Sequence, residues 1–273
     1  MVSAPSRVFP MQVGFVSPPA YFDPAPMDFL TLCPAEVGVQ SRLLHVPDYG
    51  FTLPERVRHM PLLDEAVACM AAAGADVVAQ SGTNWSFAGG ATARDCEAYC
   101  RRMGDLHGLT MHMTGLSIVE GLRALDAERI AVNTTYAWPD WSAAIVAFLS
   151  GAGFDVLHVA GFADIDGGAG AGATEWAFPL ELARRSVTRV AEAAPGADAI
   201  VFSGVPNFTD GTKPLVRMQA LAAGIEDEIG QPIVSSDLAI FWRVMDTLNL
   251  HYPEHADRRA PRLMRTLGAQ GGA

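Results

Sequence analysis

The feature that most constrains this chain is an alternation of short apolar runs, rich in β-branched residues, with longer alanine-rich stretches of helical spacing. The apolar runs are continuous, which is typical of parallel strands buried on both faces. They predict strands at residues 11–17, 76–81, 129–133, 155–159, 199–203 and 232–235. The stretches between them predict helices at residues 55–73, 93–107, 117–125, 140–151, 175–193 and 214–229. This alternation predicts an α/β fold with doubly wound parallel sheets.

Two of the predicted strand ends resemble one another. Residues 74–84, GADVVAQSGTN, align with residues 196–207, GADAIVFSGVPN, and both segments run from Gly-Ala-Asp to Ser-Gly at the same spacing. Chance similarity between buried strands is one explanation. We favour an internal duplication into two pseudo-symmetric, flavodoxin-like half-domains. The first would comprise residues 1–116 plus 235–273, and the second residues 117–234.

The position of a binding site follows from this fold class. In open parallel sheets, ligands bind beyond the carboxyl ends of the strands. Both Ser-Gly segments come directly after a predicted strand, at Ser81-Gly82 and Ser203-Gly204. We therefore expect the two loops to lie on opposite walls of a cleft between the half-domains.

Composition excludes several classes of function. The chain has 273 residues, of which 50% are hydrophobic and 18% charged, so it can bury a sizeable core. A formal net charge of −11 disfavours a nucleic-acid partner, since phosphates require basic patches. The sequence contains neither a signal peptide nor an apolar run of membrane-spanning length, so we expect a cytoplasmic protein with no membrane partner.

The cysteines and histidines do not follow the spacing of a metal site. The four cysteines, Cys33, Cys69, Cys96 and Cys100, form no zinc-binding pair of pairs, and the seven histidines include no HExxH motif. We expect reduced thiols, no metal and no cofactor.

The loop at residues 81–90, SGTNWSFAGG, resembles the first active-site loop of the aspartate/glutamate racemase superfamily. The branch of arylmalonate decarboxylases and maleate cis-trans isomerases is the most similar. Residues 13–20 resemble its first strand and Pro-Pro turn, and residues 121–136 resemble the segment that leads to its active-site tyrosine, here Tyr136. Ser203-Gly204 falls on the second active-site loop, and residues 234–242 resemble the final strand and helix.

The sequence departs from this superfamily at its catalytic thiols. The resemblance implies one cysteine at the end of the equivalent strand in each half, where this chain has Gly82 and Gly204. Arylmalonate decarboxylases normally keep the second cysteine as the proton donor. Racemisation by two thiols and isomerisation by a thiol are therefore both disfavoured.

The resemblance also implies an anion-binding site. Thr83, Asn84 and Tyr136 align with the groups that hold a carboxylate and then an enediolate, and Tyr49 is a further phenolic candidate. The alternatives are turn or capping roles for Thr83 and Asn84, and a packing role for Tyr136. The expected substrate contacts beyond these are Pro18, Gly82, Ser203, Gly204, Val205 and Asn207, with the glycines exposing backbone amides.

The sequence leaves the proton donor open. Asp237 is a candidate, although we favour a role for it as the N-cap of a helix at residues 238–248. Asp210 lies in a loop that could orient water, and Glu175 follows a glycine-rich stretch, residues 167–172, that could form a flap. His112 and His158 are candidates for an acid or base near neutral pH, but hydrogen-bonded packing is the commoner role for isolated histidines of this kind.

These observations favour a cofactor-independent lyase that decarboxylates a malonate-like acid through an enediolate. Hydrolysis of a small amide, lactam or cyclic substrate is the second hypothesis, and isomerisation of an unsaturated dicarboxylate is the third. A protein that only binds small carboxylates is the non-enzymatic alternative. A small carboxylate is the expected partner. The arginine-rich tail at residues 257–262, expected to be ordered only against a neighbour, leaves room for a homo-oligomer.

Overall fold

The structure is a computed structural model that describes residues 7–136, 138–165, 177–204, 207–209, 217–253 and 259–268. Glu175, Val205, Asp210 and the glycine-rich stretch 167–172 lie outside these ranges, so the predictions made for them stay predictions.

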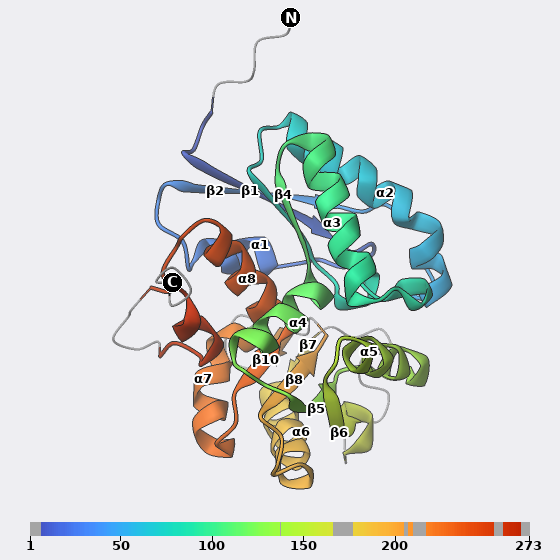
Figure 1. The fold of residues 1–273 in the computed structure, drawn as a ribbon, viewed down its shortest axis with the longest axis vertical. Coiled ribbons are helices and arrows are strands. Elements are labelled where there is room, and N and C mark those ends of the chain that lie inside the picture. The colour runs from blue at the N-terminus through green and yellow to red at the C-terminus, as the bar shows by residue number, and fades with distance from the viewer. Residues whose placement is uncertain are drawn as a thin grey trace, which may run out of the picture.

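The described chain forms two parallel four-stranded sheets (Figure 1). The first has the order β2-β1-β3-β4, with β1 (Met11–Ser17), β2 (Val37–Leu43), β3 (Val77–Gln80) and β4 (Thr110–Met113). The second has the order β10-β8-β5-β6, with β5 (Arg129–Thr134), β6 (Asp155–Gly161), β8 (Ala199–Ser203) and β10 (Ile233–Ser235). A small ribbon pairs β7 (Ala177–Pro179) with β9 (Asn207–Thr209). The α/β prediction with parallel sheets is confirmed.

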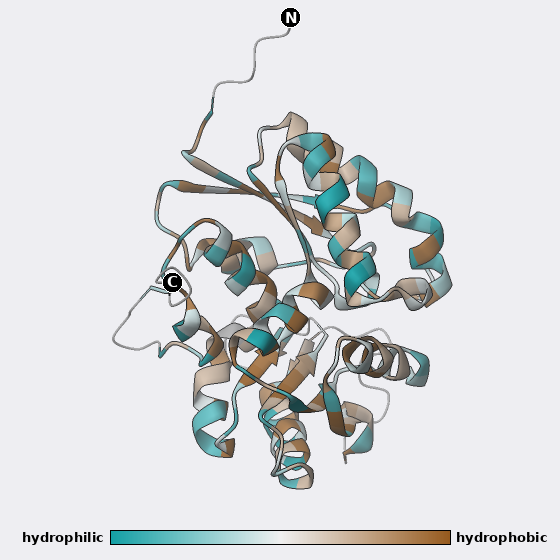
Figure 2. Cartoon of the chain, in the orientation of Figure 1, coloured by the Kyte–Doolittle hydropathy of each residue, from teal (hydrophilic) through white to brown (hydrophobic). Residues whose placement is uncertain are grey.

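Helices connect the strands. They are α1 (Ala25–Leu30), α2 (Leu53–Ala72), α3 (Ala93–His107), α4 (Thr114–Ala124), α5 (Pro139–Gly151), α6 (Leu180–Ala193), α7 (Met218–Ile229) and α8 (Ser236–Thr247). The strands of the second sheet are largely hydrophobic along their length, whereas α3 carries hydrophilic residues on much of its surface (Figure 2). Strands β5, β8 and β10 are buried, as the continuous apolar runs predict, whereas the edge strand β6 is largely exposed.

The two sheets repeat one topology. Read from β6, the second sheet has the order β6-β5-β8-β10, which matches β2-β1-β3-β4 strand for strand. The aspartates of the two Gly-Ala-Asp segments also accept equivalent hydrogen bonds. The Asp76 carboxylate accepts a hydrogen bond from the Gln12 backbone N–H at 2.9 Å, and the Asp198 carboxylate accepts one from the Arg129 N–H at 2.8 Å. Each aspartate thus anchors the start of the central strand in its own sheet.

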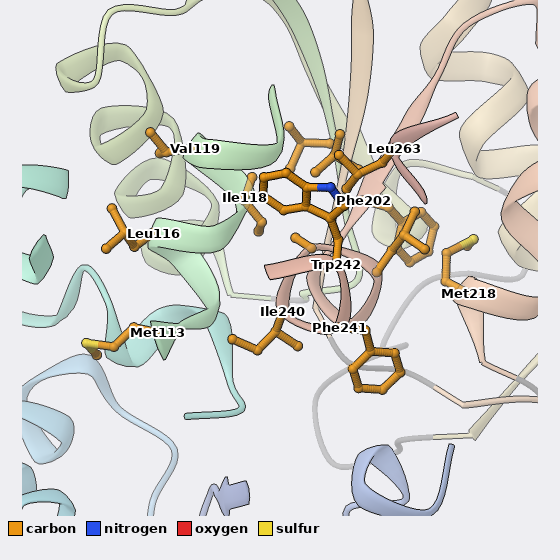
Figure 3. Packing of buried hydrophobic residues seen from close by; sticks show 14 of the residues in the cluster. Met113, Leu116, Ile118, Val119, Phe202, Met218, Ile240, Phe241, Trp242 and Leu263 are labelled. Atoms are coloured by element: carbon orange, nitrogen blue, oxygen red, sulfur yellow. The ribbon is translucent and has the colours of Figure 1, made fainter. Parts of the chain in front are cut away.

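Helices α4 and α8 lie between the two sheets (Figure 1). Figure 3 shows Ile118 of α4 and Trp242 of α8 among side chains from both the second sheet and the C-terminal segment, including Phe202 and Leu263. Ile118 and Phe202 are fully buried. This shared apolar layer fixes how the strand-end loops of one half approach those of the other.

Several elements differ from the sequence predictions. Strands β2 and β4 were not predicted, because β2 is half-exposed with an alternating pattern and β4 is a four-residue run with little β-branched character. Helix α1 and the short β7 and β9 were missed as well. The prediction of helix across residues 177–179 is wrong, since these residues form β7 and end at Pro179, which cannot occupy a helix interior without losing a hydrogen bond.

Two further findings concern the C-terminal segment and the length of the helices. The tail prediction is wrong for the described residues 259–268, because Arg259 pairs with Asp227 and the Arg262 backbone N–H donates to Glu226 at 2.9 Å within the same chain. In the part of the chain that the structure describes, no helix is long and apolar enough to cross a membrane.

Candidate functional site

A small cavity lies beyond the strand ends of the first sheet, where residues of the second half reach it. Its volume is about 30 Å³, room for about two water molecules. The lining residues are Pro18, Pro19, Tyr21, Tyr49, Phe51, Arg56, Gly82, Thr83, Asn84, Tyr136 and Trp141. Six of the predicted site residues are therefore together here: Pro18, Tyr49, Gly82, Thr83, Asn84 and Tyr136.

The loop after β3 brings three of these residues to the cavity. Gly82 has φ +94°, a conformation that favours glycine, and it turns the chain into a short 3₁₀ turn, Thr83–Trp85. Thr83 and Asn84 are buried on this turn. Among the described residues, the Asn84 side chain has no hydrogen-bond partner, so its amide is available to a ligand.

A chain of hydroxyls connects this loop to the second half. Thr83 Oγ1 lies 2.6 Å from Ser236 Oγ at the start of α8, and the same Ser236 oxygen accepts a hydrogen bond from the Gly204 backbone N–H at 3.1 Å. Ser203 Oγ donates to the Tyr136 hydroxyl at 3.4 Å. Ser203 and Gly204 therefore support the cavity from behind and do not line it.

The Gly204 position has no room for a side chain. Its φ is +118°, and a Cβ atom there would lie 2.0 Å from Thr135 Oγ1. A glycine therefore fits here against the Thr135 side chain, while its N–H donates to Ser236. The expectation that both glycine amides are open to a ligand is not met at Gly204, because its N–H is already engaged.

Aromatic side chains cover the cavity. The Phe51 ring stacks on Trp138 at 6.4 Å between centroids, and Trp138 lies 4.4 Å from Trp141. Phe51 has φ +59°, which is strained for a bulky residue. Since the cavity holds about two waters, the side chains that line it must move apart before a substrate can bind.

Three tyrosines line the cavity, and burial raises the pKa of each. Burial raises the pKa of Tyr136, and the neighbouring hydroxyls of Ser203 and Thr83 oppose that rise. Burial also raises the pKa of Tyr49 to about 12, although the Arg56 charge pulls it down. The Tyr49 hydroxyl is buried and has no hydrogen-bond partner among the described residues. All three tyrosines of the cavity are therefore protonated at neutral pH, and Tyr49 has a hydroxyl proton free for a ligand.

Arg56 is a cavity residue that the sequence analysis missed. It lies in the first turn of α2, and its exposed fraction is 2%. One guanidinium nitrogen donates to the backbone oxygens of Phe51 at 2.9 Å and Thr52 at 2.8 Å, while Nε has no hydrogen-bond partner among the described residues. The capping box formed by Thr52 and Glu55 marked this helix start in the sequence, but nothing local marked Arg56 as buried.

A second buried cluster lies behind the cavity, around Arg217. Its Nε donates to Asp237 at 2.9 Å, and two other carboxylates, Asp23 and Asp28, lie 3.4 and 3.5 Å from guanidinium nitrogens. Tyr21 joins this cluster to the cavity, because its hydroxyl accepts from Arg217 at 3.4 Å and from Asn207 at 3.2 Å. Asn207 thus contacts a cavity residue without lining the cavity.

Asp237 occupies this cluster and not the cavity. The helix-cap interpretation is wrong, since the N-cap of α8 is Ser235, whose hydroxyl accepts from the Leu238 N–H at 3.1 Å. The helix begins two residues earlier than predicted, which places Asp237 inside its first turn. Burial raises the pKa of Asp237 to about 6, against the opposing effect of Arg217.

The histidines and cysteines lie away from the cavity. His112 Nε2 is 2.8 Å from Thr247 Oγ1, and burial lowers its pKa to about 3, so the packing interpretation holds for it. His158 lies within β6, half-buried, and does not line the cavity. None of the four cysteines lines it either, and burial raises the pKa of Cys33 and Cys96 to about 12. In the described part of the chain, no group of histidine, cysteine and carboxylate side chains is arranged to hold a metal.

Residues 55–260 of the chain match the family model of arylmalonate decarboxylase. The chain belongs to the arylmalonate decarboxylase family. A search of the curated proteins found no match.

Solved structures of the same fold include several members of this family. Unliganded arylmalonate decarboxylase superposes with a TM-score of 0.72 at 23% sequence identity, covering 93% of this chain and 98% of that one. Another arylmalonate decarboxylase structure gives a TM-score of 0.66 at 24% identity, covering 93% and 99% of the two chains. The maleate cis-trans isomerase of Nocardia farcinica, bound to TRIS, gives 0.71 at 20% identity, covering 95% and 99%. At these identities, the structural likeness shows a shared fold.

Proposed function

We propose that this protein is a cofactor-independent lyase that decarboxylates a small malonate-like acid with an aryl or alkenyl substituent. The observation that carries the proposal is the cavity between the halves, which has hydrogen-bond donors and no cysteine among its lining residues. The family contains decarboxylases, and a structural neighbour is a maleate isomerase in which a mutant holds a covalently bound succinylcysteine intermediate. A chain without a thiol in this cavity is better suited to decarboxylation than to chemistry through a cysteine adduct.

The bond-breaking step requires no base. As the bond between Cα and the departing carboxylate breaks, its electron pair moves onto the retained carboxylate, carbon dioxide leaves, and an enediolate remains. Thr83, Asn84 and Tyr136 supply donors around the cavity for the growing negative charge. Phe51 and Trp141 add apolar surface to the cavity lining, and a surrounding of low polarity strengthens these interactions.

The enediolate then needs a proton at Cα. Tyr49 is the donor we assign to this step, because its hydroxyl is buried, lines the cavity and has no other partner among the described residues. The O–H bond breaks, the proton moves to Cα, and the phenolate that remains is stabilised by the nearby Arg56 charge, which lies 5.4 Å from the ring centroid. Water reprotonates the phenolate after product release.

The test is turnover of aryl- and alkenylmalonates in deuterated water, followed by gas release and proton spectroscopy. We expect carbon dioxide and one deuterium at the α carbon of the product. Addition of water without gas release would assign hydrolysis, and interconversion of maleate and fumarate would assign isomerisation. Binding of the acids without any turnover would reduce the protein to a carboxylate binder.

A pair of variants tests the assigned donor. Tyr49→Phe removes one hydroxyl and is expected to lower kcat by about 10²-fold or more, the usual contribution of a general acid, while the substrate still binds. Tyr99→Phe is the matched control, since the Tyr99 hydroxyl donates to Asp64 on α2 and does not line the cavity. Equal kcat values for the two variants would exclude Tyr49 as the donor.

A further inference from the structure

Arg56 carries a positive charge in a place that disfavours one. It is buried, and it lies in the first turn of α2, where the helix dipole also presents positive charge. Burial lowers the pKa of its guanidinium, although arginine stays charged in proteins. The fold therefore places a cation at a position where desolvation and the helix dipole both oppose it.

No carboxylate compensates this charge within the described structure. Arg56 forms no ion pair there, and every interaction it makes is either with a backbone oxygen or with an aromatic face. The adjacent Glu55 is engaged elsewhere, since its carboxylate accepts from the Gly50 N–H at 3.0 Å and from the Thr52 N–H at 2.9 Å. The exposed Asp140 also acts on Arg56 through its charge, but it forms no ion pair with it in the described part of the chain.

The aromatic contacts hold the guanidinium in place without neutralising it. Its central carbon lies 4.3 Å from the ring centroid of Trp141 and 5.4 Å from that of Tyr49. Such contacts stabilise a cation by about 0.5–2 kcal/mol each, which is less than the several kcal/mol that burial of an unpaired charge costs. The rest of the free-energy cost of burying this charge would be offset by a bound anion.

The cavity is where that anion can bind. Arg56 lines it beside Tyr49, Thr83 and Asn84, and its Nε has no hydrogen-bond partner in the described structure. Because the whole chain has a formal net charge of −11, a cation without an ion-pair partner among the described residues selects for anions at this cavity.

We propose that Arg56 is the counter-ion of the substrate and binds the carboxylate that becomes the enediolate. This assignment rests on the proposed decarboxylation, and it specifies the substrate class as a small dianionic acid that contributes the missing partner of the guanidinium. Esters and amides of the same acid leave Arg56 uncompensated and are excluded as good ligands.

The charge of the guanidinium also favours the reaction. A malonate dianion carries one negative charge on each carboxylate, whereas the enediolate left by carbon dioxide carries two on the oxygens of a single carbon. A cation beside those oxygens therefore interacts more strongly with the enediolate than with the bound acid. Binding that strengthens along the reaction lowers the barrier.

The experiment measures anion binding without turnover. Benzoate and phenylphosphonate share a phenyl ring, and at pH 9 the first carries one charge and the second about two on a single group, as the enediolate does. Calorimetry on the whole chain compares wild type with Arg56→Gln, Arg56→Lys and Arg58→Gln. Arg58 is the matched control, because it is exposed on the same helix two residues away.

We expect wild type and Arg58→Gln to bind phenylphosphonate more tightly than benzoate. Arg56→Gln should weaken phenylphosphonate binding by about 30-fold or more, the usual effect of removing one member of a buried charge pair, and abolish the preference for the dianion. Arg56→Lys should keep the preference at lower affinity, and it provides the comparison if the glutamine variant does not fold. Equal binding by wild type and Arg56→Gln, or no binding of either anion by wild type, overturns the assignment.

Turnover separates this inference from the proposed function. If the arylmalonates are not decarboxylated but phenylphosphonate binding still depends on Arg56, the lyase proposal fails and the anion site stands. If they are decarboxylated at the same kcat/KM by Arg56→Gln and by Arg58→Gln, the lyase stands and the role of Arg56 is refuted.

Discussion

The two buried arginines of this protein are held in opposite ways. Arg217 is the N-cap residue of α7, and three carboxylates surround it: Asp23, Asp28 and Asp237. Arg56 is equally buried near the start of α2 and has none. A cation whose partners are all in the chain contributes to folding, whereas a cation without them leaves a place for a ligand. The comparison separates the structural part of the polar interior from the part available for chemistry.

The substitution expected to lower the free energy of unfolding most is Arg217→Met. The substitution leaves two buried carboxylates, Asp23 and Asp237, and the partly exposed Asp28 without their cation, so the free energy of unfolding should fall by about 3–5 kcal/mol. Urea denaturation monitored by tryptophan fluorescence measures it. A loss below about 1 kcal/mol, the range of exposed ion pairs, would show that Arg217 is not the structural cation described here.

The pH dependence of stability tests the same cluster. Burial raises the pKa of Asp237 from 3.8 to about 6, with Asp23 and Asp28 adding to the rise and Arg217 opposing it. The folded protein therefore holds this proton more tightly than the unfolded chain. The corresponding stability is complete below pH 3.8 and is lost as the pH rises through about 6.

Asp237→Asn removes that titration. Between about pH 4 and pH 7, wild type should lose up to about 3 kcal/mol relative to the asparagine variant. Unfolding free energies measured across this range at fixed ionic strength give the difference. A constant difference between the two proteins across the range would assign the titration to another group.

Helix α8 connects the two regions, since Ser236 faces the cavity loop and Asp237 faces the Arg217 cluster. Ser236→Ala leaves the buried Gly204 N–H without its acceptor and frees Thr83, so we expect a loss of about 1–3 kcal/mol in stability. Chemical denaturation compares it with Ser150→Ala, an exposed serine on α5. If both variants lose the same free energy of unfolding, the chain of hydroxyls between the halves does not contribute specifically to stability.

The smallest expected change in stability belongs to Arg56→Met. It removes two hydrogen bonds to the Phe51 and Thr52 oxygens, but it also removes an uncompensated buried charge. These effects oppose one another, so the free energy of unfolding should change by no more than about 1 kcal/mol. The same urea denaturation checks it, and a loss as large as that of Arg217→Met would make Arg56 a structural residue after all.

The sequence by itself determined the fold class and the loops that carry the site. Continuous apolar strands, helical spacing and the repeated Gly-Ala-Asp to Ser-Gly segment are local patterns, and local backbone preferences act on them directly. The fold class pointed to the loops at the strand ends, whereas Thr83, Asn84 and Tyr136 within those loops were identified through the resemblance to the active-site loops of the superfamily. The half-exposed β2 and the four-residue β4 were not predicted, because their apolar patterns are weak.

Only the tertiary structure decided which charges are paired. Arg217 and Tyr21 are 196 positions apart in the sequence and meet at 3.4 Å, and Asp237 gains its partner through the same packing. Arg56 and Arg58 are nearly indistinguishable in sequence, yet one is buried against an aromatic cover and the other is exposed. The consequences of a charge depend on its burial and on its neighbours in space, and neither is a property of the local sequence.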